Sequence, residues 1–330
     1  MSRTAGTSRG DARGGMRILI AGSGAVGGYF GARLAAAGHD VVFLARGRNL
    51  AALRAHGLRV ESIDGDLHLP RVTATDALAG AAPVDLAIVT VKSYDTAATA
   101  AVIAPVVTAE TIVLSLQNGV ENESVLAAAL GLPPLLGAMT QIGAELVAPG
   151  VVRHVAEGTI FFGEPTGNES ARTRALGALF AAAGVRHRSS SQILLMLWDK
   201  LSWNAAFNAV GALTRTTAGE AARVPATARL LREAMLEVVA VARAQGILLD
   251  PARADAWVAH AAEHLGTLRT SMLQDVERGG RLEYDAINGA VVRFGEAVGV
   301  PTPIHRTFVA LLTALDPGGA RPASALSRRV

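Results

Sequence analysis

The sequence predicts an α/β protein in which a doubly wound parallel sheet is followed by an all-α C-terminal domain. In the first half of the chain, short runs that are apolar throughout alternate with helical segments. That alternation is typical of a parallel sheet covered by helices on both faces. A glycine-rich turn joins the first apolar run to the first helix, and beyond about residue 188 long helical segments follow with almost no strand signals.

The first unit of the predicted sheet lies near the N-terminus. Residues 17–22 (RILIAG) form an apolar run that ends in glycine, residues 25–37 are apolar at helical spacing, and residues 40–44 (DVVFL) form a second run. A strand, a helix and a strand within about thirty residues is the size of one βαβ unit. Further strands are expected at 85–91, 111–116, 151–153 and 159–162, with helices at 96–103 and 170–183.

The second half predicts four helices, over 192–210, 225–245, 251–264 and 287–298. The polar stretch 189–191 (SSS) reads as a linker, so we expect a sheet domain over 16–188 and a helical domain over 189–316. Residues 1–15 and 317–330 are expected to be a disordered extension and tail. The extension lacks the apolar region of a secretory signal, and Met16 is a candidate start.

Composition narrows the class of protein. The chain has 330 residues, 50% of them hydrophobic, which is enough for about two domain cores. It has no cysteine, which excludes disulfides, thiolate metal sites and cysteine nucleophiles and is compatible with the predicted cytoplasmic location. The net charge of +3 comes from the arginine-rich ends, so nucleic acid is not an expected partner. The longest uncharged run, 124–144, is broken by glycine and proline, so no membrane partner is expected either.

The glycine-rich turn fits the pattern G-x-G-x-x-G. Because it follows a strand and opens a helix, it predicts a dinucleotide-binding loop of the Rossmann type. The glycines allow the backbone to approach a pyrophosphate, and the helix N-terminus offers unpaired N–H groups. The predicted cofactor-binding residues of this loop are Gly22, Ser23, Gly24, Ala25, Val26 and Gly27.

Arg46 indicates which dinucleotide binds. NAD-binding proteins usually place a carboxylate at the end of the second strand to bind the ribose 2′-hydroxyl. The sequence FLARGR at 43–48 has no carboxylate there, and Arg46 stands where a 2′-phosphate would lie. Arginine makes planar, bidentate contacts with phosphate. The predicted cofactor is therefore NADP.

Only two of the 31 basic residues are lysines, Lys92 and Lys200. Lysine can release a proton when its pKa is lowered, whereas arginine cannot. Lys200, Asn204 and Asn208 are spaced four residues apart on an otherwise apolar helix, so they share one face. We expect this face to line a cleft, where Lys200 could act as an acid. The alternative is a face turned toward solvent.

Several short motifs occur in the order found in one enzyme family. They are the glycine loop, Arg46, Val91-Lys92, Gln117-Asn118-Gly119, Trp198-Asp199-Lys200-Leu201 with Asn204 and Asn208, Ser271-Met272-Leu273-Gln274-Asp275 and Glu283-Tyr284-Asp285-Ala286-Ile287-Asn288-Gly289. In these motifs the chain resembles the ketopantoate reductases (2-dehydropantoate 2-reductases). These enzymes reduce 2-dehydropantoate to pantoate with NADPH, in the biosynthesis of pantothenate and coenzyme A.

The resemblance implies roles for individual residues. Lys200 would donate a proton to the keto oxygen, and Glu283 would bind the substrate and help to orient the site. The implied cofactor-binding residues outside the loop are Arg46, Lys92, Asn118, Ala144 and Glu283. The implied substrate-binding residues are Asn118, Lys200, Asn204, Asn208 and Ser271.

The sequence leaves four points open. Ala218 stands where some family members have a substrate-binding asparagine, so the substrate could be another branched 2-keto acid. His260, Glu263 and His264 fit H-x-x-E-H, a zinc-binding pattern, so a zinc site is an alternative. We nevertheless expect that the protein binds no metal there. An NADP-binding sensor without activity is a further alternative. The chain could be a monomer or a homodimer.

Overall fold

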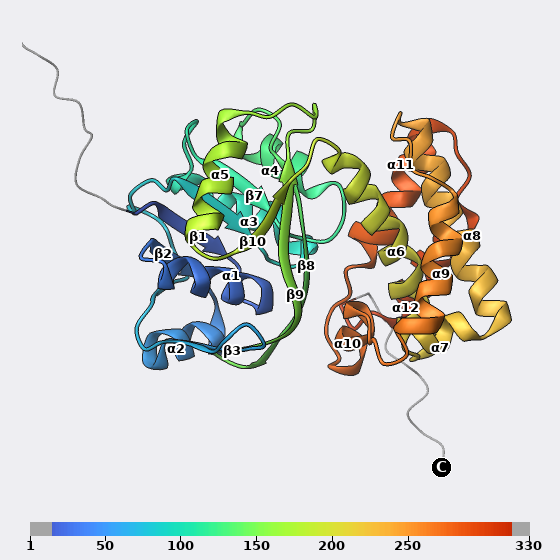
Figure 1. Cartoon of the computed structure of the whole chain (residues 1–330), viewed down its shortest axis with the longest axis horizontal. Coiled ribbons are helices and arrows are strands. Elements are labelled where there is room, and N and C mark those ends of the chain that lie inside the picture. Colours follow the sequence, from blue (N-terminus) through green and yellow to red (C-terminus); the bar gives the residue numbers. More distant parts are fainter. Residues whose placement is uncertain (1–14, 319–330) are drawn as a thin grey trace, which may run out of the picture.

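The computed structural model describes residues 15–318, so most of the predicted extension and most of the predicted tail lie outside the described residues. Figure 1 shows two halves joined through α6 (Ile193–Thr214), with sheets and helices on one side and helices alone on the other. The predicted fold class is confirmed.

The first sheet has five parallel strands in the order β5-β2-β1-β6-β7. Their bounds are β1 (Arg17–Ala21), β2 (Asp40–Leu44), β5 (Thr73–Thr75), β6 (Leu86–Val89) and β7 (Ile112–Ser115). Neighbours in β1 point to opposite cores: Ile18 and Ile20 pack into one buried cluster, whereas Leu19 and Ala21 pack into another. A sheet with two buried faces explains why these strands are apolar throughout rather than alternating.

The helices of this half are α1 (Ala25–Ala36), α2 (Gly47–His56), α3 (Thr96–Ile103), α4 (Asn122–Leu130) and α5 (Ala171–Ala182), with short 3₁₀ turns η1 (Ser93–Asp95) and η2 (Ala104–Val106). Predicted helices match α1, α3 and α5 to within one residue at each end. Helices α2 and α4 were not predicted. The apolar residues of α2 are interrupted by polar ones, and those of α4 form one short run over 125–130.

A second sheet corrects the prediction of two short strands near residue 155. It contains β3 (Leu58–Ser62), β4 (Leu67–Leu69), β8 (Gly137–Ala148), β9 (Val151–Gly163) and β10 (Arg186–Ser189). Strand β9 runs without a break across 151–153 and 159–162. The β8–β9 register shifts near Glu157, where side chains are exposed, so the apolar pattern stops while the backbone stays extended. Strand β10 also reaches into the polar stretch predicted to be a linker.

From Ile193 to Leu315 the described chain is helical apart from turns. After α6 come α7 (Ala218–Arg223), α8 (Pro225–Ala244), α9 (Ala252–His264), α10 (Ser271–Glu277), a π-helical turn η3 (Asp285–Gly289), α11 (Ala290–Val298) and α12 (Pro303–Leu315). The predicted helices at 192–210, 225–245 and 251–264 correspond to α6, α8 and α9. The one predicted at 287–298 is divided, because η3 supplies its first turn.

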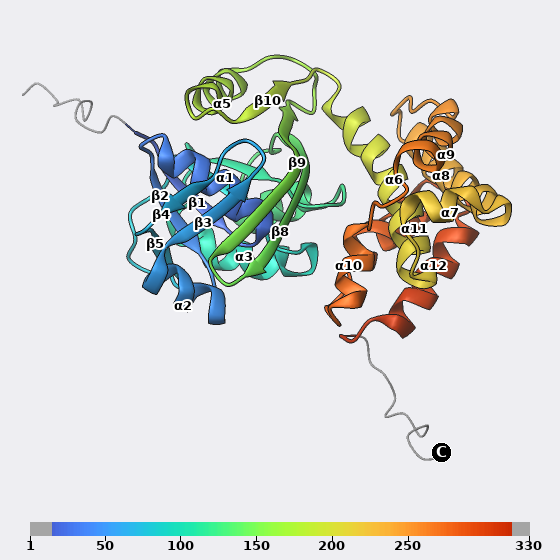
Figure 2. The ribbon, with the colours of Figure 1, turned by 60° about the horizontal axis from the view of Figure 1, so that its bottom comes forward.

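Helix α6 is the central element of the helical half (Figure 2). Its residues Ala205 and Phe207 are almost fully buried among side chains from α8 and α12. Asp199 accepts hydrogen bonds from Arg253 and from Trp257 on α9. These contacts fix the rotation of α6 and thus the direction in which the neighbouring Lys200 points.

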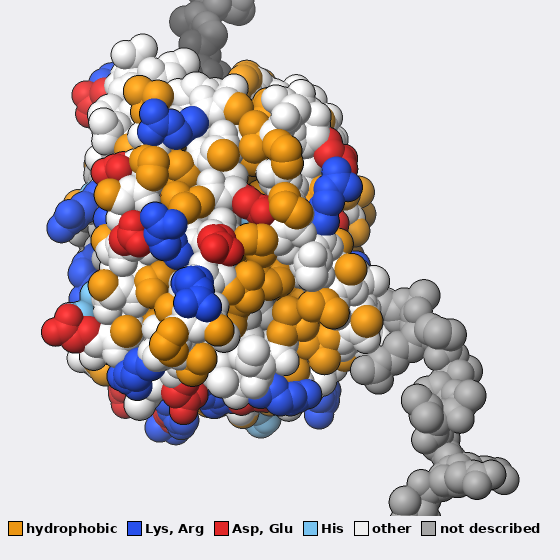
Figure 3. All heavy atoms as spheres, turned by 90° about the vertical axis from the view of Figure 1, so that its right-hand side faces the viewer, with side chains coloured by type: hydrophobic (Ala, Val, Ile, Leu, Met, Phe, Trp, Pro, Cys, Tyr) orange, Lys and Arg blue, Asp and Glu red, His pale blue; other side chains and the backbone are white. Residues whose placement is uncertain are grey.

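The outer face of the helical half carries side chains of both charge signs interspersed with apolar ones (Figure 3). Within residues 15–318, none of the helices combines the length and the hydropathy that crossing a bilayer requires.

Candidate active site

The glycine loop lies between β1 and α1, as predicted. Gly22 has φ +108°, and a Cβ there would lie 2.7 Å from the backbone nitrogen of Val91. A Cβ on Gly27 would overlap the carbonyl oxygen of Gly22. Both positions therefore require glycine so that α1 can pack closely against the ends of β1 and β6.

The N-terminus of α1 is suited to bind a phosphate group. Among the described residues, no side chain caps this helix, and its first turn contains no acidic residue. A Cβ added to Gly24 would meet no described atom within 4 Å, so the backbone faces open space at that point. The backbone N–H groups of the first turn can therefore bind a pyrophosphate. Ala25 and Val26 are the first residues of the helix and are half-buried.

Two side chains hold the loop against its surroundings. The Ser23 hydroxyl donates to the carbonyl oxygen of Leu44 at 3.0 Å, and Asn49 donates to the carbonyl oxygen of Ser23 at 2.7 Å. Arg46, at the N-cap of α2, has an exposed side chain beside this turn. The turn thus brings Arg46 close to the loop, on the side where the second strand ends.

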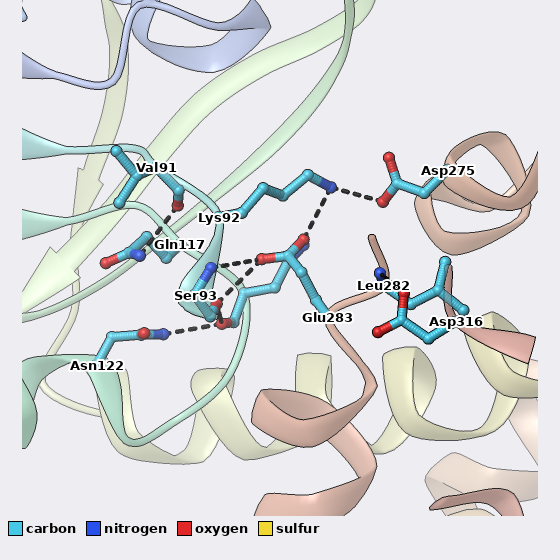
Figure 4. Close-up of polar contacts among 10 residues, drawn as sticks. Val91, Lys92, Ser93, Gln117, Asn122, Asp275, Leu282, Glu283 and Asp316 are labelled. Atoms are coloured by element: carbon cyan, nitrogen blue, oxygen red, sulfur yellow. Dashed lines mark hydrogen bonds and ion pairs between the residues drawn. The ribbon is translucent and has the colours of Figure 1, made fainter. Parts of the chain in front are cut away.

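A cluster of charged residues connects the two halves (Figure 4). The ammonium group of Lys92, just beyond β6, lies 2.6 Å from Asp275 on α10 and 3.0 Å from Glu283. Burial alone would lower the pKa of Lys92, but the two carboxylates outweigh it and raise the pKa above its ordinary value. Burial also raises the pKa of Asp275, which Lys92 partly offsets. Lys92 therefore remains a cation at every physiological pH.

Glu283 is held on its other side by Ser93. The backbone N–H of Ser93 donates to one Glu283 oxygen at 2.9 Å, and the Ser93 hydroxyl lies 3.0 Å from the same oxygen. That hydroxyl is also 2.7 Å from the carbonyl oxygen of Asn118. The Glu283 side chain is only 7% exposed. The contacts thus place Glu283 beside the loop that carries Asn118, although the two are 165 positions apart in the sequence.

Side-chain hydrogen bonds hold the loop after β7 in place. Asn122 donates to the carbonyl oxygen of Asn118 at 2.8 Å and accepts from Thr96 at 2.9 Å. Gln117 donates to the carbonyl oxygen of Val91 at 3.0 Å, which links the ends of β6 and β7. The candidate residues Lys92 and Asn118 therefore stand on one hydrogen-bonded edge of the sheet.

Lys200 crosses from the helical half to the second sheet. Its ammonium group donates to the carbonyl oxygen of Thr140 on β8 at 2.9 Å. Burial lowers the pKa of Lys200 to about 8, and the nearby Glu283 carboxylate opposes that change. At neutral pH Lys200 is therefore mostly an ammonium that can release its proton readily.

The two asparagines predicted to share a face with Lys200 are buried. Asn204 is 7% exposed and Asn208 is 1% exposed. Within the described residues, neither amide atom of Asn208 has a hydrogen-bond partner. A buried amide without partners is costly, so this face of α6 is suited to a polar ligand or water. The alternative of a solvent-facing stripe is wrong for these two asparagines.

The remaining predicted residues make no side-chain hydrogen bond to this cluster within the described part of the chain. Ser271 is exposed at the start of α10, four residues before Asp275, and Ala144 is half-buried in β8. Ala218 is buried at the start of α7. His264 lies 3.6 Å from Glu263 on an exposed face, and within the described chain no three His, Asp or Glu residues are grouped for a metal.

The sequence analysis gave no role to Ser93 or to the carboxylate of Asp275. Ser93 directly follows Lys92 at the end of a strand, which is a position where backbone N–H groups are exposed to a ligand or a carboxylate. Asp275 lies in a motif that the sequence analysis quoted, but its partner Lys92 is 183 positions away. Only the packing of the two halves brings these residues together.

Comparison with known proteins identifies the family. The model described as "Ketopantoate reductase PanE/ApbA" matches residues 18–167, and the model described as "Ketopantoate reductase PanE/ApbA C terminal" matches residues 192–316. This chain belongs to the ketopantoate reductase family. Its family comprises oxidoreductases that use a nicotinamide dinucleotide and act on small keto acids.

Individual ketopantoate reductases are similar along nearly the whole chain. The 2-dehydropantoate 2-reductase of Archaeoglobus fulgidus is 37% identical over 303 residues, which covers 92% of this chain and 98% of that protein. A crystal structure of a PanE/ApbA family ketopantoate reductase from Ralstonia eutropha JMP134 has a TM-score of 0.84 at 37% identity, covering 91% and 98% of the two chains. A D-mandelate dehydrogenase determined with NADH and anilino(oxo)acetate shares the fold, with a TM-score of 0.82 at 23% identity.

Two alanine substitutions test the cofactor loop. Because Gly24 faces open space, we expect Gly24→Ala to keep the wild-type melting temperature but to weaken dinucleotide binding at least tenfold, since the new methyl group would occupy space that a pyrophosphate needs. Gly27→Ala should instead lower the melting temperature, because its methyl group meets the chain itself. Calorimetric titration and thermal denaturation measure the two effects. Unchanged dinucleotide affinity in Gly24→Ala would contradict this placement.

Proposed function

We propose that this chain catalyses the NADPH-dependent reduction of 2-dehydropantoate to pantoate, in the biosynthesis of pantothenate and coenzyme A. The observation that best supports it is Lys200, an ammonium with a pKa near 8 that stands between the halves within the field of Glu283. In this proposal, residues 16–188 bind NADPH and residues 189–316 supply most of the substrate-binding groups.

The chemistry needs one proton and one hydride. When bound, the reduced nicotinamide supplies the hydride to C2 of the keto acid. Lys200 hydrogen-bonds to the keto oxygen, stabilises the negative charge that develops there, and donates its proton as the alcohol forms. With a pKa of about 8, about nine in ten Lys200 side chains carry that proton at pH 7.

Glu283 orients the substrate in this proposal. One of its oxygens is held by Ser93 and the other by Lys92, yet a carboxylate can accept further hydrogen bonds, including one from a substrate hydroxyl. Asn204 and Asn208 offer the amide groups for the polar end of the substrate, and Ser271 would bind its carboxylate. These contacts contribute orientation rather than chemistry.

On the cofactor side, the glycine loop binds the pyrophosphate and Arg46 binds the 2′-phosphate. The exposed guanidinium of Arg46 at the start of α2 supports this role, because it is unobstructed by the protein and adjoins Ser23 through the turn. Lys92 adds positive charge at the end of β6. On the resemblance alone, we assign Ala144 to the cofactor-binding surface and Asn118 to both the cofactor-binding and the substrate-binding surfaces.

A second candidate function is the reduction of another branched 2-keto acid. The observation in its favour is Ala218, which is buried and cannot supply the polar contact found in some relatives. A substrate hydroxyl that lacks a partner loses much of the discrimination between otherwise similar keto acids.

A substrate comparison tests the proposed function. NADPH oxidation is measured with 2-dehydropantoate, 2-ketoisovalerate and 2-ketoisocaproate at equal concentrations. We expect kcat/KM to be highest for 2-dehydropantoate by at least tenfold, because only that substrate has the 4-hydroxyl that Glu283 and the buried amides can bind. A preference for either of the other two would support the second candidate. No NADPH oxidation with any of them would contradict both.

The role of Lys200 predicts a specific pH dependence. Because the donor must be an ammonium, reduction should be constant below pH 8 and fall about tenfold for each pH unit above it. The reverse oxidation needs the neutral amine and should rise through the same range. Lys200→Ala should lower kcat by about 10²–10⁴ and remove this dependence. A loss of less than threefold would contradict proton donation by Lys200.

The role of Arg46 predicts a change in cofactor preference. Arg46→Ala should raise the KM for NADPH at least tenfold and change the KM for NADH less than twofold, since only NADPH has the 2′-phosphate. Arg48→Ala, two residues along in the same exposed turn, serves as the matched control. Equal effects of Arg46→Ala on both cofactors would show that Arg46 does not bind the 2′-phosphate.

A further inference from the structure

A second ion pair joins the two halves outside the cluster around Lys92. The guanidinium of Arg293 on α11 meets the carboxylate of Glu121 through two hydrogen bonds, at 3.2 Å from Nε and 2.5 Å from Nη2. The same guanidinium donates to the Asp285 carboxylate at 2.8 Å and to the Asp285 carbonyl oxygen at 3.0 Å. Glu121 belongs to the sheet half, whereas Arg293 and Asp285 belong to the helical half.

This ion pair is more precisely oriented than an ordinary surface ion pair. Two parallel N–H···O bonds between a guanidinium and a carboxylate fix both the distance and the orientation of the partners. The hydrogen bond with Glu121 raises the pKa of Arg293 above its ordinary value, against a smaller effect of burial. By contrast, the Arg278–Glu145 pair, which also joins the halves, uses one guanidinium nitrogen and one carboxylate oxygen.

Two glycines allow the backbones to approach at this point. A Cβ on Gly119 would lie 2.8 Å from the carbonyl oxygen of Ala286 in η3. A Cβ on Gly289 would lie 2.5 Å from the Asp285 carboxylate and 3.0 Å from Arg293. The contact at Gly119 is with backbone and Gly119 has φ +104°, so this position needs glycine for the loop and η3 to meet. At Gly289 a Cβ would instead displace the side-chain ends of Asp285 and Arg293.

The pair also stands next to both candidate segments. Glu121 follows Asn118 by three residues on the loop between β7 and α4, and Asp285 follows Glu283 by two residues at the start of η3. The wide turn of a π-helix is often found at functional sites. Arg293 therefore ties the loop that carries Asn118 to the turn that follows Glu283.

We propose that Glu121 and Arg293 are positioning residues for keto acid reduction. They hold the two halves at the spacing at which Asn118 and Glu283 act on one substrate, and they touch neither substrate nor cofactor. This inference rests on the proposed function. Without the pair, the substrate itself must supply more of the free energy that closes the site, so the KM for the keto acid rises while kcat changes little. The glycine loop and Arg46, to which we assign the phosphate groups of NADPH, lie entirely in the sheet half, so NADPH affinity should change less than the KM for the keto acid.

A double-mutant cycle tests the proposal. Glu121→Gln and Arg293→Gln should each raise the KM for the keto acid about two- to fivefold, the range expected for an exposed ion pair. The kcat and the Kd for NADPH should stay within twofold of wild type. The double variant should be no worse than Arg293→Gln alone, because that change already removes the Glu121 interaction together with the bonds to Asp285. Glu296→Gln is the control, since it breaks the Arg306–Glu296 pair, which is more exposed and lies inside the helical half.

Additive effects in the cycle, or a KM for Glu121→Gln equal to that of Glu296→Gln, would overturn the proposal. Amide hydrogen exchange in the protein without ligands separates this result from a failure of the proposed function. Glu121→Gln should speed exchange at residues 119–122 and 285–289, and Glu296→Gln should not. Unchanged exchange would show that the Glu121–Arg293 pair does not hold these two segments together. If exchange is faster but the protein reduces no keto acid, the pair does hold the two segments together, and its proposed role in the reaction is overturned.

Discussion

The ammonium group of Lys200 is the charge on which the site depends. It is held against β8, where the carbonyl oxygen of Thr140 and the negative charge of Glu283 replace part of the water that would surround an exposed lysine. Replacing water incompletely destabilises the charged form, and this lowers the pKa into the range where proton donation is efficient. Had Glu283 paired directly with Lys200, it would have raised the pKa and removed that property.

The charged cluster on the opposite side keeps Glu283 from doing so. Lys92 and Ser93 engage both Glu283 oxygens, which leaves the carboxylate near Lys200 without a direct ion pair. Two lysines thus have opposite properties. Lys92 has a raised pKa and holds the halves together, whereas Lys200 has a lowered pKa, as the proposed proton donation requires. Arginine could replace neither the proton donation nor the compact point charge.

The sequence was informative where function depends on neighbours in the chain. The glycine loop, Arg46 and the stripe Lys200, Asn204 and Asn208 each lie within one turn or one helix, so spacing alone predicted their geometry. The parallel sheet could be predicted from runs that are apolar throughout, because a strand buried on both faces has apolar residues at nearly every position.

Contacts between distant segments could not be predicted in this way. The partners of Lys92 lie 183 and 191 positions away. The place of Ser93 after a strand allows it to bind a carboxylate, but nothing local indicates that this carboxylate is Glu283. The full length of strand β9 was not predicted because its middle is exposed and irregular. The π-helical turn η3 was not predicted because its apolar spacing is nearly the same as that of the α-helix it opens. In each case the determining interaction is tertiary.

The two lysines permit a direct test of the central claim. In protein labelled with ¹³C at lysine Cε, a pH titration followed by NMR gives two resonances, one for each lysine in the folded body. Because burial lowers the pKa of Lys200, one resonance should shift with a midpoint near pH 8 and be lost in Lys200→Arg, while the other should not shift below pH 10. If both resonances titrate above pH 10, Lys200 is an ordinary lysine and the account is contradicted.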